Sequence, residues 1–386
     1  MANGIRVHLT RLKLESFRNY EKLVLDCDQR HVVLTGENGA GKTNLLEAIS
    51  YLSPGRGLRR APYERVAKSS SDGAWSVFAE LEGTSGPVSI GTGLQMTPLG
   101  PDSQRRVRIN GAQVKSAEAL LEHARVVWLT PAMDGLFSGP AGDRRKFLDR
   151  LVLAVNPGHG RHVGDFEKAM RARNRLLGED APDGAWLDAI ETQLAETGIA
   201  IIIARMELVS LLTGLIVREA DPASPFPDAV LALEGTLDAL AQDMATGEMA
   251  ASELEDLYRD KLKAGRRLDA AAGRTLEGPH RTDLKVTHRP KAMEAALCST
   301  GEQKALLVGI LLAHARLVAE LTGAAPILLL DEIAAHLDSG RRAALFDRID
   351  MLNCQAWMTG TDKSLFAAMG DRAQHFQVAG GTVTPD

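Results

Sequence analysis

A glycine-rich loop with a lysine and a threonine at its end is the part of the chain best suited to chemistry. It reads Gly36-Glu37-Asn38-Gly39-Ala40-Gly41-Lys42-Thr43-Asn44, and Gly36-x-x-x-x-Gly41-Lys42-Thr43 fits the P-loop pattern completely. Glycines let backbone N–H groups approach phosphate oxygens, and the N-terminus of the following helix adds its positive dipole end. Lys42 is expected to reach the β- and γ-phosphates, and the Thr43 hydroxyl to bind Mg²⁺.

The alternative is a glycine turn followed by a chance Lys-Thr pair. A β-branched run at residues 31–35 precedes the loop, and an apolar-periodic segment follows it to about residue 52. A strand before the loop and a helix after it are the context that a phosphate loop needs. The sequence therefore predicts a site for a nucleoside triphosphate and Mg²⁺.

Two adjacent carboxylates follow an apolar run late in the chain. Residues 327–330 predict a buried strand, and Asp331 and Glu332 come directly after it. Ligands bind at the carboxyl ends of strands in open α/β sheets, so Asp331 is expected to hold Mg²⁺ through its water shell. Glu332 is then placed to orient or deprotonate the attacking water. Alone this pattern is common, but together with a P-loop it indicates phosphoryl transfer.

A second candidate phosphate site precedes that strand. The stretch is Ser299-Thr300-Gly301-Glu302-Gln303, at the start of a predicted long helix. Ser299 as N-cap and Glu302 as its capping-box partner would explain two of the residues structurally. Alternatively, the Ser299 hydroxyl and the Gly301 N–H form a phosphate site at the positive helix terminus. Because one P-loop already surrounds the nucleotide, this second site is expected to act on ATP held by another subunit.

The remaining chain predicts an α/β fold with a mixed sheet and an inserted, mainly helical lobe. Short strands are expected on either side of residues 17–20, with a bulge or bend where the alternation changes phase after Leu9. Further strands are predicted at 75–81, 88–94, 105–109, 126–129 and 356–359. Helical periodicity begins after Asp143 and extends, with a break at 222–227, through 231–262. We assign 1–135 and 276–386 to a discontinuous ATP-binding lobe, and 136–275 to the helical lobe.

Arginines gather in two places. Arg56, Arg59, Arg60 and Arg65 follow the P-loop helix, where a solvated face and contact with nucleotide or DNA phosphate are both plausible interpretations. Arg171, Arg173 and Arg175 are a second candidate patch for phosphate contact, but a solvated helix face is favoured there. The net charge of −5 over 386 residues gives no global attraction to nucleic acid, so DNA binding would have to depend on such local patches.

Other features indicate a chain of the reducing cytoplasm. The three cysteines are far apart and form no C-x-x-C pair, which argues against a disulfide framework or a zinc site. The most apolar segment, 198–217, is interrupted by Arg205 and Glu207 and therefore predicts a buried helix, with no transmembrane anchor.

Taken together, these motifs resemble the ABC-type P-loop ATPase heads of the SMC class, and most closely the RecF family of bacterial recombination mediators. The stretches that carry the resemblance span the chain: Leu14-x-x-Phe17-Arg18-Asn19-Tyr20, Gly36 to Ala48, Arg144-Arg145-x-Phe147-Leu148-Asp149, Gly278-Pro279-His280-Arg281, Ser299-x-Gly301-Glu302-Gln303-Lys304, Leu329-Leu330-Asp331-Glu332 and Leu337-Asp338.

The resemblance implies ATP-driven homodimerisation, in which Ser299 and Gly301 of one subunit close over the γ-phosphate held by the other. By similarity it adds Arg18, Gln303 and Asp338 to the nucleotide-binding residues. It further implies binding to DNA at single-strand gaps, ss/ds junctions or duplex, and slow DNA-stimulated ATP hydrolysis. Cooperation with RecR and RecO in loading RecA, in the SOS response to DNA damage, and a cytoplasmic, nucleoid-associated location also follow from the resemblance alone.

The sequence departs from the family pattern in the Q-loop region. Pro131 is followed by Ala132, where family members often have Pro-Glu-Asp, so no Mg²⁺ ligand is assigned there. The aromatic-Arg motif reads Gly57-Leu58-Arg59, and the usual acidic pair after the Pro-His-Arg motif is Thr282-Asp283. Two other functions remain as hypotheses: a structural DNA clamp that binds ATP without turnover, and an ABC transporter subunit.

Overall fold

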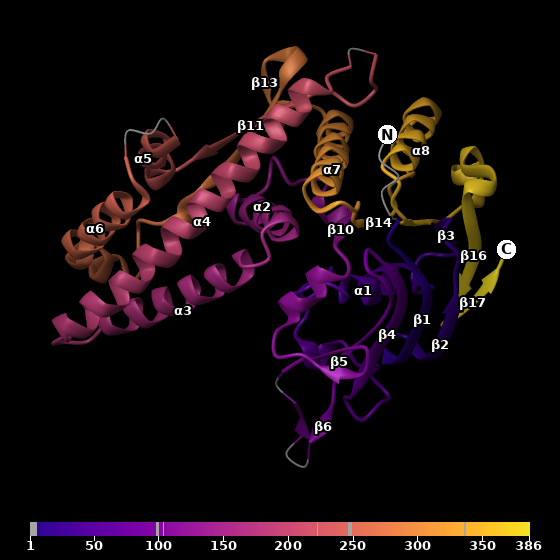
Figure 1. The fold of residues 1–386 in the computed structure, drawn as a ribbon, viewed down its shortest axis with the longest axis horizontal. Helices are drawn as coiled ribbons and strands as arrows, with labels where there is room; N and C mark the ends of the chain where they lie inside the picture. Colours follow the sequence, from indigo (N-terminus) through magenta and orange to yellow (C-terminus); the bar gives the residue numbers. More distant parts are fainter. Residues whose placement is uncertain (1–5, 98–99, 103, 222, 246–248, 336) are drawn as a thin grey trace. The chain divides into compact units, whose positions relative to one another are not determined.

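The computed structural model describes residues 6–386 except 98–99, 103, 222, 246–248 and 336 (Figure 1). Its contacts divide the chain into two compact units. Unit 1 contains the described residues up to Asp134, together with Asp221–Pro227 and Ser299–Asp386, and unit 2 contains Gly135–Ala220 and Asp228–Cys298. Residues 276–298, which the sequence assigned to the ATP-binding lobe, are grouped by contacts with unit 2 because β12 (Asp283–His288) pairs with β11 (Ala229–Glu234).

A mostly parallel sheet organises unit 1. The strand order is β10-β14-β15-β3-β16-β17, and only β17 runs antiparallel to its neighbour. The strands are β3 (His31–Thr35), β10 (Val126–Leu129), β14 (Ile327–Leu330), β15 (Ala356–Gly360), β16 (Ala373–Ala379) and β17 (Thr382–Pro385). Every residue of β3, β10, β14 and β15 is buried, as expected for parallel strands covered on both faces. The carboxyl ends of β3, β14 and β15 therefore meet at one edge of the sheet.

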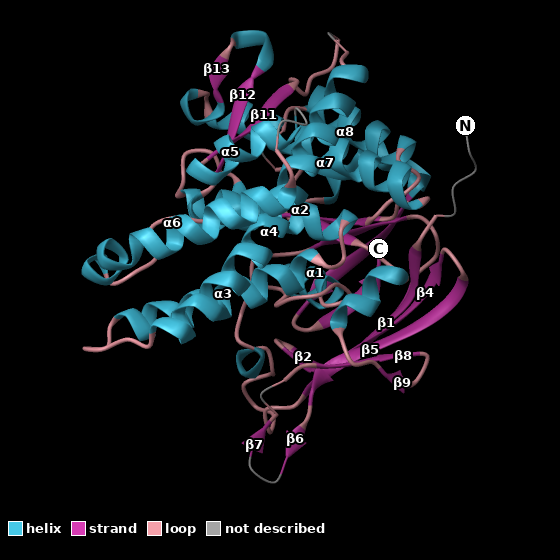
Figure 2. Ribbon diagram, turned by 60° about the vertical axis from the view of Figure 1, so that its left-hand side comes forward, coloured by secondary structure: helices cyan, strands magenta, loops and turns pink. Residues whose placement is uncertain are grey.

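An antiparallel sheet forms the other layer of unit 1, and Figure 2 shows β1, β4, β5 and β8 side by side. The order is β2-β1-β4-β5-β8-β9. The strands are β1 (His8–Phe17), β2 (Tyr20–Asp26), β4 (Trp75–Gly83), β5 (Gly86–Leu94), β8 (Arg106–Ile109) and β9 (Ala112–Gln113), and β6 (Met96–Thr97) and β7 (Gly100–Pro101) make a separate pair. The register of β1 against β4 shifts between Leu9 and Arg11, which confirms the predicted bulge.

Helices complete unit 1. They are α1 (Lys42–Ser50), α7 (Thr300–Thr322) and α8 (Ser339–Met351), with 3₁₀ turns η1 (Tyr63–Arg65), η2 (Ala117–Glu122), η3 (Pro131–Met133) and η7 (Lys363–Arg372). Leu45, Leu46 and Ile49 of α1 are fully buried in a cluster that also contains Val32 and Leu34 of β3. The helix that follows the glycine-rich loop is thus fixed to the strand that precedes it.

Unit 2 combines long helices with a small sheet. The helices are α2 (Ala141–Val155), α3 (His159–Leu177), α4 (Gly184–Arg218), α5 (Thr236–Ala245) and α6 (Ala251–Ala272), with 3₁₀ turns η4 (Pro279–Arg281), η5 (Arg289–Lys291) and η6 (Ala295–Leu297). The sheet has the order β11-β12-β13, the last being Met293–Glu294. The prediction of helical periodicity from residue 231 was wrong at its start, because Leu231 lies in β11 and faces the interior.

Arg173 does not belong to a solvated helix face. Its guanidinium is fully buried and donates to the carboxylates of Glu191 at 2.9 Å and Asp269 at 2.6 Å. Further hydrogen bonds go to the Thr275 hydroxyl and the Leu262 carbonyl. A buried charge requires such partners, since desolvation otherwise costs several kcal/mol. The prediction for this position was therefore wrong, and Arg173 joins α3, α4 and α6 inside unit 2.

Among the residues that the structure describes, two helices, α4 and α7, are long and apolar enough to cross a membrane by length and composition. In both, more than half of the most apolar window is buried inside the protein, which is the property of a core helix. Arg205 on α4 is buried and paired with Asp149 of α2. Helix α4 is thus held by a polar contact as well as by its apolar face.

Candidate phosphate-binding site

The glycine-rich loop is shaped by contacts that exclude side chains at two glycines. Gly36 has φ 144°, and a Cβ there would lie 2.2 Å from the Val378 carbonyl oxygen of β16. Gly41 has φ 117°, and a Cβ there would lie 2.5 Å from Asn19 and 2.7 Å from the Tyr20 hydroxyl. Those two side chains donate hydrogen bonds to the loop carbonyls of Ala40 and Gly41. The turn between β1 and β2 therefore supports the loop from outside.

Lys42 lies under the loop. Its ammonium group is buried, with the residue 4% exposed, and donates to the carbonyl oxygens of Gly36 at 2.6 Å and Glu37 at 2.9 Å. Burial lowers the pKa of Lys42, while the nearby carboxylates of Glu332 and Asp331 act in the opposite direction. The lysine is thus a buried charged donor held by the loop backbone, and its contact with the β- and γ-phosphates stays a prediction.

A cluster of two hydroxyls and one carboxylate lies where three strands end. Thr43 donates to Asp331 at 3.0 Å, and Thr359 at the end of β15 donates to the same carboxylate at 2.7 Å. Burial is the main cause that raises the pKa of Asp331, and the two hydroxyl hydrogen bonds oppose it. The structure therefore joins Thr43 and Asp331, as predicted from sequence, through a hard-oxygen donor set that suits Mg²⁺.

Thr359 was not assigned a role from the sequence. Its β15 lies between β3 and β14, so its last residues stand between the P-loop strand and the strand of Asp331. The only sequence signal was a second polar strand end, Thr359-Gly360-Thr361-Asp362, and the order of strands is not readable from it.

Glu332 has a left-handed backbone, with φ 49°. This conformation is unusual for a residue with a Cβ, and its N–H donates to the Thr359 hydroxyl at 2.8 Å. Glu332 lines a cavity of about 180 Å³ together with residues of the loop and helix α1. The lining consists of Asn38, Gly39, Gly41, Lys42, Thr43, Asn44, Arg59 and Glu332.

The arginine predicted by resemblance to contact phosphate has another partner here. Arg18 forms a two-pronged ion pair with the fully buried carboxylate of Glu47 on α1 and donates to the Arg65 carbonyl. Arg59 contacts the same carboxylate at 2.9 Å and also Asn44, and it lines the cavity. Of the two interpretations open for the arginine cluster, the geometry favours phosphate contact at Arg59.

The Ser299 segment caps helix α7. Ser299 accepts a hydrogen bond from the Glu302 N–H, and the Glu302 carboxylate accepts one from the Ser299 N–H at 3.0 Å. This capping box is the structural explanation that the sequence offered. Gly301 has open space around its Cα, and Gln303 is buried. Among the described residues, the cavity lining includes none of this segment.

Asp338, predicted by resemblance to bind the nucleotide, lies outside the cavity lining. Asp338 is exposed at the N-cap of α8, where it accepts from the Arg341 N–H. In the Q-loop region, Asp134 forms an ion pair at 3.3 Å with Lys304, which is buried on α7. His280, which received no role from the sequence, is bound by its ring to the Thr275 carbonyl in unit 2.

A family model and curated relatives similar to this chain carry the same family name. The family model described as "RecF/RecN/SMC N terminal domain" matches residues 8–384. The chain is 58% identical over 379 residues to "DNA replication and repair protein RecF" of Rhizobium meliloti (strain 1021), covering 98% of this chain and 99% of that relative. A relative of the same name from Rhizobium rhizogenes is 59% identical with the same coverage.

Solved structures support the fold. "Structure of the recombination mediator protein RecF-ATP in RecFOR pathway" aligns over 100% of this chain and 99% of that chain, with a TM-score of 0.85 and 23% identity. An Smc head domain from Pyrococcus furiosus aligns over 98% of this chain and 96% of that one, with a TM-score of 0.53 and 16% identity. The predicted fold, an ABC/SMC-type head with mixed α/β sheets and an inserted helical part, is confirmed.

Proposed function

Because this chain belongs to the RecF family, we propose that it is an ATP-dependent DNA-binding protein of recombinational repair. ATP binding drives dimerisation on DNA at gaps or ss/ds junctions, and slow hydrolysis resets the dimer. With RecO and RecR it promotes RecA loading, in the cytoplasm on the nucleoid. The observation that carries the ATP-dependent part is the cluster of Thr43, Asp331 and Thr359 beside the buried Lys42.

The residues present fit ATP with Mg²⁺. Thr43 and Asp331 supply the hydroxyl and carboxylate oxygens that Mg²⁺ prefers, and they are already in contact. Lys42 and the N–H groups of the glycine-rich loop offer positive charge and donors to phosphate oxygens, with the N-terminus of α1 behind them. Bound Mg²⁺ would neutralise charge on the phosphates during transfer of the terminal phosphoryl group.

Glu332 is the candidate general base. Glu332 lines the cavity, and its backbone N–H is held by the Thr359 hydroxyl. A carboxylate there accepts a proton from water, while Lys42 and Arg59 stabilise the charge that develops on the phosphate oxygens. The Thr359 hydroxyl bonds to both the Asp331 carboxylate and the Glu332 N–H, and thereby fixes the position of the metal ligand relative to the base.

The Ser299 segment lies outside the cavity lining of its own chain, which a site shared between two copies would explain. Ser299 is exposed and Gly301 has free space, so the N-terminus of α7 is accessible to a ligand carried by a second copy. Its dipole and N–H groups favour an anion. In this arrangement Ser299 and Gly301 contact the terminal phosphate on the other subunit, and the exposed Asp338 belongs to the same interface, while the buried Gln303 stays inside unit 1.

The proposed dimerisation is tested by size-exclusion chromatography with light scattering. Wild-type chain is expected to shift from monomer to dimer when ATP and Mg²⁺ are added. Ser299→Arg should remain monomeric, because a long cationic side chain at the exposed N-cap obstructs the approach of the second copy. Loss of the cap costs only about 1 kcal/mol, so the variant should still fold.

Ser116→Arg is the matched control, since Ser116 is likewise an exposed N-cap serine in unit 1, at η2. It should dimerise as the wild type does. A Ser299→Arg chain that is folded by circular dichroism and still forms the ATP-dependent dimer would remove the support for the shared site.

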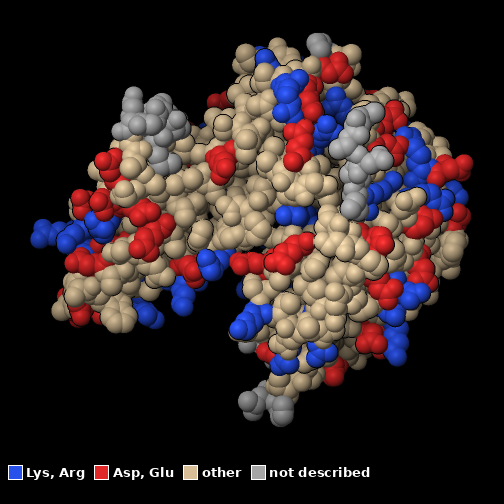
Figure 3. All heavy atoms as spheres, viewed as in Figure 1, with Lys and Arg blue, Asp and Glu red and all other residues tan. Residues whose placement is uncertain are grey.

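The proposed DNA binding carries a salt prediction. Lys and Arg are interspersed with Asp and Glu on the face drawn in Figure 3, in keeping with the net charge of −5, so contact with DNA has to use local groups of cations. Affinity for gapped duplex in the presence of ATP is expected to fall steeply with salt, as counterions are released from phosphates. Fluorescence anisotropy across a salt series checks this, and affinity independent of salt would contradict it.

A further inference from the structure

The segment after helix α1 turns back along that helix. Residues 51–62 begin at the carboxyl end of α1, and Arg59 returns to its first turns, where it contacts Asn44 and Glu47. The side chain of Arg59 is 41% exposed, and hydrogen bonds to Asn44 and Glu47 hold its guanidinium on α1. These contacts require that the backbone of the return segment brings Arg59 back to the first turns of the helix.

Arg105 holds the start of that segment. Its guanidinium donates to three backbone carbonyls there, to Tyr51 at 2.5 Å, Ser53 at 3.1 Å and Gly55 at 3.0 Å. It also lies over the Tyr51 ring, 5.3 Å from the ring centre. The Tyr51 carbonyl belongs to the C-cap of α1, where a helix leaves carbonyl acceptors unpaired and its dipole favours a cation.

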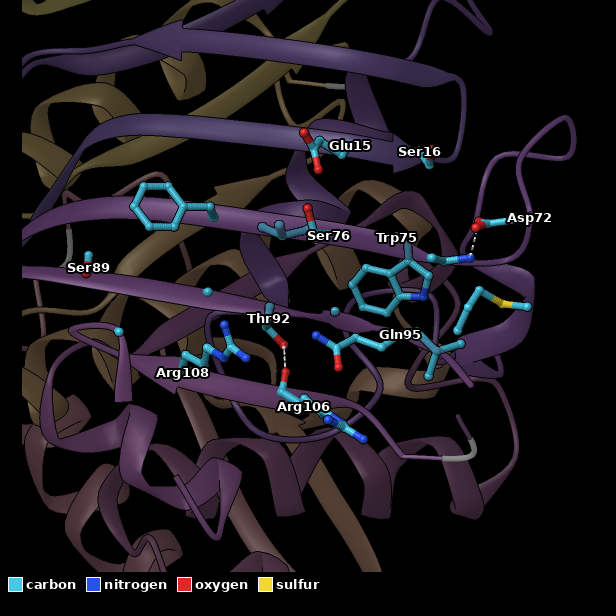
Figure 4. A pocket seen from close by; sticks show the side chains of 18 residues that line it. Glu15, Ser16, Asp72, Trp75, Ser76, Ser89, Thr92, Gln95, Arg106 and Arg108 are labelled. Carbon is cyan, nitrogen blue, oxygen red and sulfur yellow. Dashed lines mark hydrogen bonds between the residues drawn. The ribbon is translucent and has the colours of Figure 1, made fainter. Parts of the chain in front are cut away.

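A hydroxyl on the antiparallel sheet orients Arg105. The Nε–H of Arg105 donates to the Thr92 hydroxyl of β5 at 2.6 Å, and that hydroxyl donates to the Arg106 carbonyl of β8 at 3.1 Å. Figure 4 shows the second of these bonds in a groove of about 800 Å³ that Thr92 and Arg106 both line. The Arg105 guanidinium is thus held by Thr92 of the antiparallel sheet and by the three carbonyls of the return segment.

Contacts continue from the clamped carbonyls to Arg59. The Leu58 N–H donates to the Ser50 hydroxyl at 2.8 Å, and that hydroxyl donates to the Glu47 carbonyl. Gly57 has φ 65°, and a Cβ there would lie 2.9 Å from the same hydroxyl. Residues 57 and 58 therefore pack directly against Ser50 of α1, between the carbonyls that Arg105 holds and Arg59.

We propose that Arg105 is a positioning residue, which fixes residues 51–58 on helix α1 and thereby places the Arg59 guanidinium at the phosphate cavity. The inference rests on the proposed ATP hydrolysis, since Arg59 is expected to stabilise charge that develops on the phosphate. Arg105 does not line the cavity, so it acts through Arg59. A lysine cannot replace it, because the contacts need the planar fork of several donors.

The test compares Arg105→Ala, Arg105→Lys, Arg59→Ala and the double variant Arg59→Ala/Arg105→Ala in the full chain. Arg105→Ala is expected to lower kcat of DNA-stimulated ATP hydrolysis by about tenfold to a hundredfold, the loss typical of a misplaced group. Affinity for a fluorescent ATP analogue should be unchanged. The double variant should have the kcat of Arg59→Ala alone, because the same contribution is lost only once.

Arg106→Ala is the matched control on the neighbouring position, where the side chain pairs with Asp102 and not with the return segment. It should leave kcat unchanged. If loss of Arg105 lowers kcat by the same factor with and without Arg59, or leaves kcat at the wild-type value, the positioning role is wrong.

Amide hydrogen exchange gives an answer independent of turnover. Arg105→Ala should speed exchange in residues 52–60, and Arg59→Ala should not. Unchanged exchange in this segment would overturn the inference. Wild-type chain without measurable ATP turnover would instead contradict the proposed hydrolysis, and the exchange result would still decide the role of Arg105.

Discussion

Replacing Lys42 by arginine is expected to abolish ATP hydrolysis and ATP-dependent dimerisation. The Lys42 ammonium is buried and fits between two loop carbonyls at 2.6 and 2.9 Å, where the broader guanidinium has no room without moving the loop. Removing one fixed donor to a developing phosphate charge costs about 10²–10³ in kcat, and a displaced loop adds a loss of nucleotide affinity. Steady-state ATPase assays and equilibrium titration with a fluorescent ATP analogue measure the two effects separately.

Lys146→Arg is the matched control, because Lys146 on α2 has a side chain 56% exposed and pairs with Asp143 within one helical turn. It should hydrolyse ATP at the wild-type rate. Wild-type hydrolysis by a folded Lys42→Arg chain would show that the glycine-rich loop does not hold the reacting phosphates.

The parts of the site that sequence predicted are those in which neighbours along the chain make the feature. The P-loop is one example, because strand, glycines, lysine and helix are contiguous from His31 to Ser50. The capping box at Ser299 is another, since its two partners are three residues apart. The spacing of residue types identifies such features in the sequence, even where tertiary contacts complete their geometry, as Asn19 and Tyr20 do for the loop.

Features made by distant segments were not predictable in the same way. Thr359 reaches Asp331 only because β15 is inserted between β3 and β14, and one sequence does not reveal that strand order. Arg173 looked like a surface residue because its partners, Glu191 and Asp269, lie on other helices. In both cases the tertiary arrangement decides what a polar side chain does.

The roles of the arginines that contact Glu47 were also not predictable from the sequence. Resemblance to SMC-class heads indicated Arg18 as a phosphate contact, while the arginine cluster after α1 was left between two interpretations. In the structure both Arg18 and Arg59 pair with the buried Glu47, but only Arg59 lines the cavity. A buried carboxylate shared by two arginines is not visible in the sequence, because nothing in Glu47's local pattern separates it from a surface helix position.

Replacing Glu332 by glutamine is expected to stop hydrolysis while leaving ATP binding intact. Glutamine keeps the size of the side chain and the backbone contact to Thr359, but it cannot accept a proton from water. Loss of a general base lowers kcat by about 10²–10⁴, so bound ATP should persist. The ATP-bound dimer should then accumulate, measured as a dimer peak by light scattering that outlasts removal of free ATP.

The same variant separates a turnover ATPase from a structural clamp that binds ATP without hydrolysing it. In the clamp, dimer lifetime does not depend on the base, so Glu332→Gln and wild type should behave alike. Glu122→Gln, at the exposed last residue of η2, makes the same chemical change outside the cavity and should leave both kcat and dimer lifetime unchanged. If Glu332→Gln prolongs the dimer and Glu122→Gln does not, hydrolysis is the step that separates the two subunits. The attacking water is then activated at the carboxyl end of β14.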